Sequence, residues 1–176
     1  DSNTSTWNQA GDDIDGEAAD DLSGHSLAIS ADGNRIAIGA RRNDGNGEDS
    51  GHVRIFDWDS NTSTWNQAGD DIDGEAEGDQ SGESIAMSAD GTRIAIGAEH
   101  NFGTDAMLLY SGHVRVFDWD SDTSNWNQAG DDIDGEAEGD EFGDAMAMSA
   151  DGTRIAIGAG HNGGNGEDSG HVRVFD

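Results

Sequence analysis

The sequence predicts an all-β fold, a β-propeller-like array of four-stranded antiparallel blades. Two observations lead to this prediction. A stretch of about 60 residues occurs three times along the 176-residue chain. Each copy holds four short apolar or β-branched segments with turn residues between them, and none has the spacing of an amphipathic helix. Another stacked β architecture, a solenoid or a sandwich, is the alternative for such a pattern.

The three copies are recognised by a run that begins Asp-Ser-Asn-Thr-Ser-Thr-Trp. It starts at Asp1, returns at Asp59 and returns in altered form at Asp120. The second copy is longer by a three-residue loop insertion. The predicted organisation is one structural unit made of repeat 1 (1–58), repeat 2 (59–119) and repeat 3 (120–176).

The first copy shows how four strands arise. Residues 26–30 alternate apolar and small side chains, and the dipeptide Asp32-Gly33 separates them from residues 35–40. Asp-Gly between two alternating runs is a strong signal for a β-hairpin. Residues 52–56 form the third predicted strand, and residues 62–67, which belong to the next copy, supply the fourth.

The charge is strongly one-sided. Asp and Glu number 38 against 8 basic residues, which gives a formal net charge of −30. A nucleic acid partner is excluded, because binding it requires a basic surface. The compact state is expected to be favoured where salt or divalent cations screen the carboxylates.

No apolar stretch approaches the roughly 20 residues that a membrane-spanning helix requires, so no membrane span is predicted. The chain has no Cys, which leaves the redox compartment open. Because it begins at Asp1 without a signal-like segment, we expect a mature form or an excerpt.

Three repeats are too few to close a propeller, which usually has four to eight blades. The expected partners are therefore further copies of the repeat, through self-association or a longer parent chain. Two chains sharing a six-bladed ring and a head-to-tail filament are both compatible with the pattern.

The third copy carries a recognisable series of motifs. Phe142-Gly143 is followed by the turn Asp151-Gly152, by Gly158-Ala159 and by Gly170-His171-Val172-Arg173-Val174-Phe175. This order resembles the FG-GAP repeat of integrin-α type over essentially the whole chain. The other copies place Ser23 and Ser81 where the third has Phe, and no copy has the family's Pro after Gly-Ala.

The resemblance implies propeller blades, an extracellular or cell-surface location and calcium loops between the first two strands. Here that loop is reduced to an Asp-Gly turn, so Asp32, Asp90 and Asp151 are interpreted as turn-forming residues and not as calcium ligands.

Two other acidic stretches keep calcium possible as a cofactor, because calcium takes six to eight oxygen ligands from flexible loops. One stretch occurs in every copy and the other is a Gly-rich loop. Solvated connections are the alternative interpretation for both. The candidate ligands are Asp12, Asp13, Asp15, Asp70, Asp71, Asp73, Asp131, Asp132 and Asp134 in the first stretch, and Asp44, Asn46 and Asp49 in the second.

Surface residues suggest further sites. Asn3 and Asn61 begin N-glycosylation sequons in a predicted turn. Trp58 and Trp119 are predicted at exposed turns, where they could stack on sugar rings, whereas Trp7, Trp65 and Trp126 recur at a packing position. The inserted loop of repeat 2 carries an apolar run that is a candidate partner contact: Met107, Leu108, Leu109 and Tyr110.

No catalytic residue is assigned. Asp49, Ser50 and His52 have the residue types of a hydrolase triad. Such a triad is recognised by the spatial arrangement of its side chains and not by their closeness in the sequence. The sequence therefore predicts a protein that is not an enzyme, an extracellular structural or adhesion module that assembles with further repeats or into a filament. A calcium-dependent, carbohydrate-binding propeller with glycan partners is the alternative.

Overall fold

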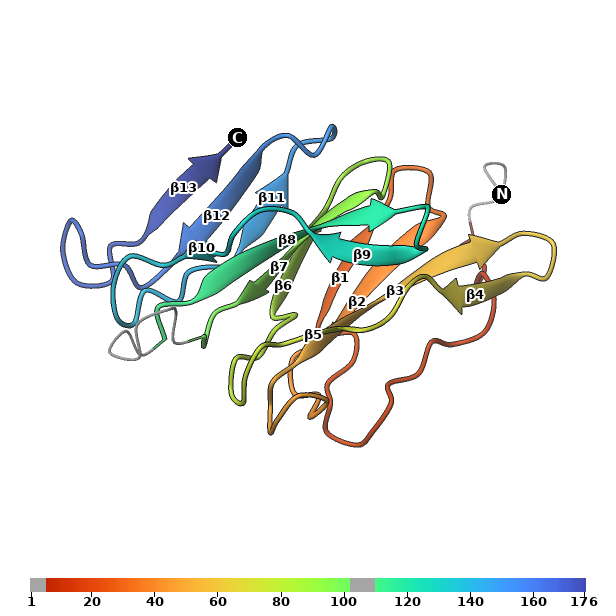
Figure 1. The fold of residues 1–176 in the computed structure, drawn as a ribbon, viewed down its shortest axis with the longest axis horizontal. Helices are drawn as coiled ribbons and strands as arrows, with labels where there is room; N and C mark the ends of the chain where they lie inside the picture. The colour runs from red at the N-terminus through yellow and green to blue at the C-terminus, as the bar shows by residue number, and fades with distance from the viewer. Residues whose placement is uncertain (1–5, 102–109) are drawn as a thin grey trace.

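The computed structural model describes residues 6–101 and 110–176, which form three antiparallel sheets (Figure 1). These two ranges contain no helix, and so none that could cross a membrane. The sheets follow one another along the chain and do not form a closed barrel. The predicted all-β class and its blade-like sheets are confirmed.

The first sheet has the strand order β1-β2-β3-β4, and β5 also pairs with β3. Its third strand crosses the boundary between repeats 1 and 2, and its last two strands belong to repeat 2. The strands are β1 (Ser26–Ile29), β2 (Arg35–Ala40), β3 (His52–Asp59), β4 (Thr64–Gln67) and β5 (Ile72–Asp73).

The second sheet repeats this order, and the third has three strands among the described residues, in the order β11-β12-β13. Both β9 and β10 pair with β8, as β4 and β5 do with β3. The strands are β6 (Ser84–Met87), β7 (Arg93–Ala98), β8 (His113–Asp120), β9 (Asn125–Gln128), β10 (Ile133–Asp134), β11 (Met146–Met148), β12 (Ile155–Ala159) and β13 (His171–Phe175).

The Asp-Gly turns join the first two strands of each sheet as predicted. Asp32 Oδ1 accepts hydrogen bonds from Ser30 Oγ at 2.7 Å and from the Asn34 backbone N–H at 3.0 Å. Gly33 has a φ of 74°, which glycine adopts without steric cost. These hydrogen bonds lower the pKa of Asp32 to about 2. Asp90 and Asp151 form the same turns, so the turn-forming interpretation is confirmed.

The hydrophobic core lies between successive sheets, not inside one. Side chains of β2, β3 and β7 meet between the first two sheets, where Ile55, Ile94 and Ile96 are almost completely buried. A second cluster between the second and third sheets centres on Phe142 and Ile157. Each blade is therefore stabilised mainly by apolar burial against the next one.

The two outer faces of the array expose positions that are covered inside it. On β1, Leu27 and Ile29 are each 59% exposed. Their equivalents on β6, Ile85 and Met87, pack against the first core cluster. On the last strand, Val172 is 66% exposed, although the equivalent Val in β3 and in β8 is completely buried.

Glu99, which follows β7, lies near several other carboxylates. Burial raises its pKa to about 7, and the negative charges of Glu83, Asp144 and Glu141 add to this effect against the opposing charge of Arg41. The folded protein thus binds the Glu99 proton more tightly than the unfolded chain, whose carboxyl pKa is near 4.5. This stabilising contribution is complete below pH 4.5 and is lost as the pH rises through 7.

The Glu99→Gln variant should therefore lose stability less than the wild type when the pH is raised from 5 to 8. Urea unfolding at the two pH values measures this difference. Glu138→Gln removes the same charge at an exposed position and serves as the control for general charge repulsion. Equal pH dependence in the two variants would contradict the assignment to Glu99.

Candidate functional site

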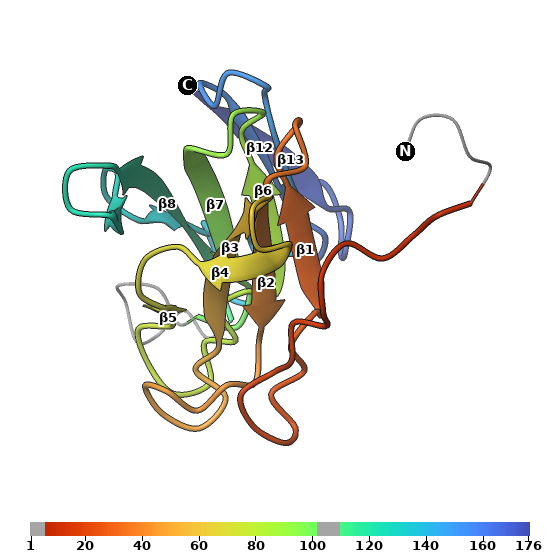
Figure 2. The same ribbon diagram turned by 90° about the vertical axis from the view of Figure 1, so that its right-hand side faces the viewer.

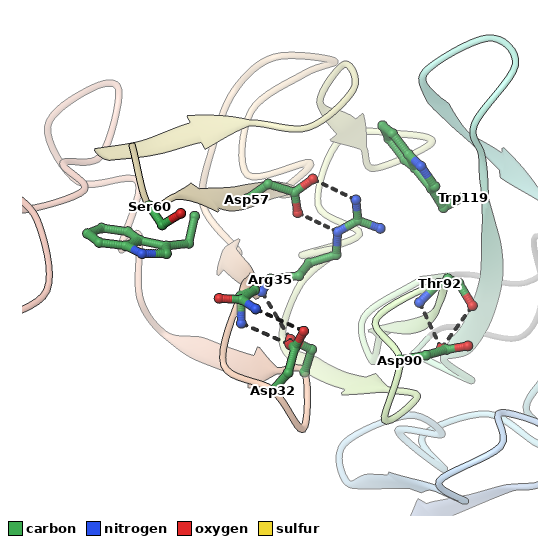
Figure 3. Close-up of a pocket in the computed structure, with 10 residues that line it drawn as sticks. Asp32, Arg35, Asp57, Ser60, Asp90, Thr92 and Trp119 are labelled. Carbon is green, nitrogen blue, oxygen red and sulfur yellow. Dashed lines mark hydrogen bonds and ion pairs between the residues drawn. The ribbon is translucent and has the colours of Figure 1, made fainter. Parts of the chain in front are cut away.

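A groove of about 470 Å³ lies between the first and second blades. Its walls come from the β1–β2 and β6–β7 turns and from the far ends of β3 and β8. Figure 3 shows Arg35 and Asp57 between the turn that carries Asp32 and the indole of Trp119. The other lining residues are Ser30, Asn34, Trp58, Ser60, Asp90 and Thr92.

Arg35 connects the two blades across this groove. Its Nε and Nη2 donate to the two carboxylate oxygens of Asp57 at 2.6 and 2.7 Å, and its Nη1 donates to the Gly91 carbonyl oxygen at 3.0 Å. The guanidinium carbon lies 4.6 Å from the ring centroid of Trp119 and 5.4 Å from that of Trp126. Bidentate pairing and stacking are both properties of arginine and not of lysine.

The same arrangement recurs one repeat later. Arg93 donates to both oxygens of Asp118 at 2.6 and 2.8 Å and to the Gly152 carbonyl oxygen at 3.0 Å. The hydrogen bonds to Asp118 raise the pKa of Arg93, and the same bonds lower the pKa of Asp118. In the third repeat, Arg154 pairs with Asp176, and both side chains are largely exposed.

Arg35→Lys is expected to lower the free energy of unfolding by about 1–3 kcal/mol, because a lysine cannot keep the bidentate pair and the bond to the next blade together. Urea unfolding measures the loss. Arg154→Lys is the matched control, since both partners of its ion pair are exposed and such a pair contributes little to stability. Equal losses in the two variants would contradict the role of Arg35 between the blades.

The prediction that Trp58 and Trp119 lie at turns is wrong, because β3 and β8 continue through them to Asp59 and Asp120. Trp58 pairs in register with Trp65, and their ring centroids are 5.2 Å apart. Both Trp58 and Trp119 are partly exposed and line the groove, so sugar stacking there stays a prediction.

The recurring tryptophans of β4 and β9 pack as predicted, each against a segment of the preceding repeat. Trp65 Nε1 donates to the Ala10 carbonyl oxygen and Trp126 Nε1 donates to the Ala68 carbonyl oxygen, both at 3.0 Å. Trp7, the equivalent residue near the start of the chain, is completely exposed.

Two clusters of potential metal ligands lie at the opposite ends of β3 and β8 from the groove. Glu17, His52 and Asp71 form the first, and their ligand atoms lie within 4.8 Å of one another. Glu75, His113 and Asp132 form the second in the same way. These groups have the chemistry to bind a metal ion.

The register of the outer strands creates these clusters. β5 pairs with the beginning of β3, so that His52 lies opposite Asp73 and close to Asp71. Arg54 Nη2 donates to the Asp15 carbonyl oxygen at 2.7 Å and so positions the segment that carries Glu17. Burial lowers the pKa of His52, which favours the neutral imidazole that a metal ion requires.

Most of the predicted calcium ligands do not come together. Within the described residues, Asp71 and Asp132 are the predicted aspartates that lie in a group of three potential ligands. In the Gly-rich loop, Asp44 Oδ1 accepts the Asp49 backbone N–H at 2.9 Å, and Asn46 Nδ2 donates to the Gly74 carbonyl oxygen at 2.8 Å. The histidines of the two clusters were missed, although a His begins the third strand of every copy.

A known family of repeats matches this chain in two places. The model of the FG-GAP repeat matches residues 14–56 and 133–175. The chain is an FG-GAP repeat protein. The matched segments end at Phe56, within β3, and at Phe175, the last residue of β13, so each contains a Gly-x-Val-x-Val/Ile-Phe motif. FG-GAP repeats are typical of extracellular proteins.

Several solved structures have a similar fold. One of them is a protein from Bacteroides uniformis described as a candidate 6-phosphogluconolactonase, and the match has a TM-score of 0.50 at 18% sequence identity. The match covers 86% of this chain and 40% of that structure, so the FG-GAP chain spans less than half the length of the relative. At this identity the likeness concerns the fold alone. No curated protein sequence matches the chain.

The remaining predicted sites of the FG-GAP chain have mixed outcomes. Asn61 lies in the exposed β3–β4 turn, where its backbone N–H donates to Asp59 Oδ1, and its glycosylation stays a prediction. Tyr110 is partly exposed and its ring lies 5.0 Å from that of His100. Asn3, Met107, Leu108 and Leu109 lie outside the described residues.

Ser50 has the environment of a structural residue. It is completely buried, and its Oγ donates to the Asn43 carbonyl oxygen at 3.2 Å. A nucleophile needs instead an accessible hydroxyl that is hydrogen-bonded to a base.

Proposed function

We propose that this FG-GAP chain is a non-catalytic, extracellular structural or adhesion module that associates head to tail with further copies of itself. The exposed outer faces of the array support the proposal most strongly. Val172 and Val174 on the last strand, and Leu27 and Ile29 on the first, occupy positions that are covered at the inner blade contacts. A second copy that presents its first blade to the third blade of its neighbour would cover both faces.

The strand edges support the same contact. Outer strands β4 and β5 cover the edge of β3, whereas β13 pairs with β12 alone among the described strands. Residues 6–15 correspond in sequence to the segment that forms β4 and β5 but form no strand here, and the N-terminal end of this segment runs away from the sheets in Figure 2. In the proposed contact, residues 6–15 of a second copy add to β13 by antiparallel pairing, a recognised mode of strand addition.

Such a contact joins two different surfaces and is therefore heterologous. If the rotation from one blade to the next brings the sixth blade back against the first, two copies make a closed six-bladed ring. If it does not, the contact repeats into a filament. The net charge of −30 opposes either assembly, so association should strengthen as salt is raised.

Sedimentation velocity over a range of protein and salt concentrations tests the proposal. The wild type is expected to form dimers or longer oligomers, and the double variant Val172→Gln/Val174→Gln should remain monomeric without a change in net charge. Asn127→Gln, at an exposed position on β9, is the control and should associate like the wild type. If the wild type at high salt sediments entirely as monomers of 18.4 kDa, the proposal is contradicted.

Carbohydrate binding in the groove is a second candidate function, and the placement of Trp58 and Trp119 in one groove favours it. The hydroxyls of Ser60 and Thr92 and the carboxylates of Asp57 and Asp90 supply polar groups beside the two indoles. Flat apolar rings with neighbouring hydrogen-bonding groups suit sugar rings.

A glycan array probed with and without calcium tests this function and its predicted calcium dependence together. Binding should be lost in Trp58→Ala and kept in Trp7→Ala, whose indole lies outside the groove. No binding under either condition, or equal binding by both variants, would rule out the groove as a sugar site.

A further inference from the structure

We propose that each complete Glu–His–Asp cluster binds a divalent transition-metal ion such as Zn²⁺, so that a row of such ions follows the repeats. The ligands are Glu17, His52 and Asp71 in the first site. Glu75, His113 and Asp132 occupy the corresponding positions in the second. An imidazole nitrogen with two carboxylate oxygens suits zinc and its neighbours, whereas calcium prefers oxygen ligands alone.

The imidazoles are the first argument. His52 and His113 are almost completely buried, yet their Nδ1 atoms lie 3.9 Å from Glu17 Oε2 and 3.7 Å from Glu75 Oε2. Both separations are too long for a hydrogen bond. Two atoms that share a zinc ion at about 2.0–2.2 Å lie within about 4.4 Å of each other. The spacing thus fits ligands around an ion better than a direct hydrogen bond.

The glutamates leave one oxygen for the ion. Glu17 Oε1 lies 3.6 Å from Arg54 Nη1, while Oε2 faces His52. In the second cluster, Glu75 Oε1 lies 3.9 Å from Arg115 Nη1 and Oε2 again faces the imidazole. The arginine therefore orients the carboxylate without occupying the oxygen that points into the cluster.

The aspartates are oriented in a similar way. Asp71 Oδ1 accepts a hydrogen bond from Gln67 Nε2 at 2.6 Å, and Asp132 Oδ1 accepts one from Gln128 Nε2 at 2.7 Å. Hydrogen bonds of this kind, made to the ligands themselves, are typical around protein metal sites. Both aspartates remain accessible enough for an ion to enter.

The charge around the clusters completes the argument. Around the second cluster, the carboxylates of Glu75, Asp132, Asp134 and Asp79 face one arginine, Arg115. A divalent cation would balance the remaining negative charge.

Zn²⁺ binding by equilibrium dialysis, with the protein held at low salt as a monomer, tests the two sites. The wild type should bind two ions per chain. Asp71→Asn/Asp132→Asn should weaken both sites by at least about 10-fold. Asp70→Asn/Asp131→Asn removes the same charge from the preceding residues and should leave both sites intact. Circular dichroism checks that every variant is folded.

Several results would overturn the proposal. One is equal Zn²⁺ binding by the two double variants, which would show attraction by general negative charge. Another is displacement of Zn²⁺ by an equal concentration of Ca²⁺, which would show a site of oxygen ligands alone. With Co²⁺ as the probe, the absence of the absorption bands of a coordinated ion would likewise contradict it.

A third site is half-formed in repeat 3, where His171 Nδ1 lies 4.0 Å from Glu136 Oε2. Its aspartate would come from Asp13 of a second copy, because Asp13 is the equivalent of Asp71. This extension rests on the proposed head-to-tail association. At high salt a third ion per chain should appear, and Asp13→Asn should remove it. Oligomers without a third ion would overturn this extension, whereas monomers that bind two ions would contradict the association alone.

Discussion

Replacing Phe142 with alanine is expected to lower the free energy of unfolding by about 3–5 kcal/mol. Phe142 is completely buried between the second and third blades. Its ring lies 6.3 Å from that of Phe175 in an edge-to-face arrangement, and the guanidinium carbon of Arg173 lies 4.9 Å from its centroid. The smaller side chain removes apolar contacts from both blades and leaves a cavity that these strands cannot fill.

Urea unfolding of the variant, followed by tryptophan fluorescence, gives the change in free energy. Trp7→Ala is the control at a fully exposed aromatic residue and should change stability by no more than about 0.5 kcal/mol. A loss below about 1 kcal/mol in Phe142→Ala would mean that the third blade does not depend on this contact.

Gly97→Ala is the second substitution with a large expected effect. A Cβ atom at Gly97 would lie well inside 3.0 Å of the Gly143 carbonyl oxygen, which belongs to the next blade. This contact is with backbone, so the blades would have to separate. A cost of about 1–3 kcal/mol or more is expected for such overpacking.

Gly158 provides a matched control, because it occupies the same position in repeat 3. A Cβ atom there would approach the Ala145 carbonyl oxygen to 3.4 Å, which is ordinary contact. Gly158→Ala should therefore leave unfolding nearly unchanged. If a second copy stacks on the third blade, the same substitution should weaken association, which sedimentation can measure. A large loss of stability in Gly158→Ala would contradict this account of the blade contacts.

Much of the fold could be predicted because its signals are local and repeated. The Asp-Gly turn and the flanking alternation placed the first two strands of the first blade to within a residue. The end of the third strand could not be predicted as well. Asp57 and Asp59 look like turn residues, but Asp57 pairs with Arg35 on the neighbouring strand and extends β3 through Trp58. That pairing depends on tertiary contact.

The candidate site was harder to predict for the same reason. Each cluster of potential metal ligands contains three side chains from distant parts of the sequence. They are a glutamate that precedes the first strand of the blade, a histidine at the start of its third strand and an aspartate next to its fifth strand. Only the register of β5 on β3 brings His52 and Asp71 together, and the sequence does not reveal that register. The recurrence of a His at 52, 113 and 171 was a signal that could have drawn attention to these clusters, but it was missed.

The central claim is that the contact between blades inside the chain is repeated between chains, and thiol cross-linking tests it most directly. Inside the array, the Ala31 backbone N–H donates to the Ala89 carbonyl oxygen at 2.8 Å, and the Ala89 N–H donates to Ala150 at 2.9 Å. The next contact in this series would join Ala150 of one copy to Ala31 of another.

The chain has no cysteine, so Ala31→Cys and Ala150→Cys can each be the single thiol of a separate variant. A short bis-maleimide added at high salt should cross-link an equal mixture of the two variants into a covalent dimer and leave each variant alone mainly uncross-linked. A mixture that yields no dimer, or a variant that cross-links equally well with itself, would contradict head-to-tail stacking.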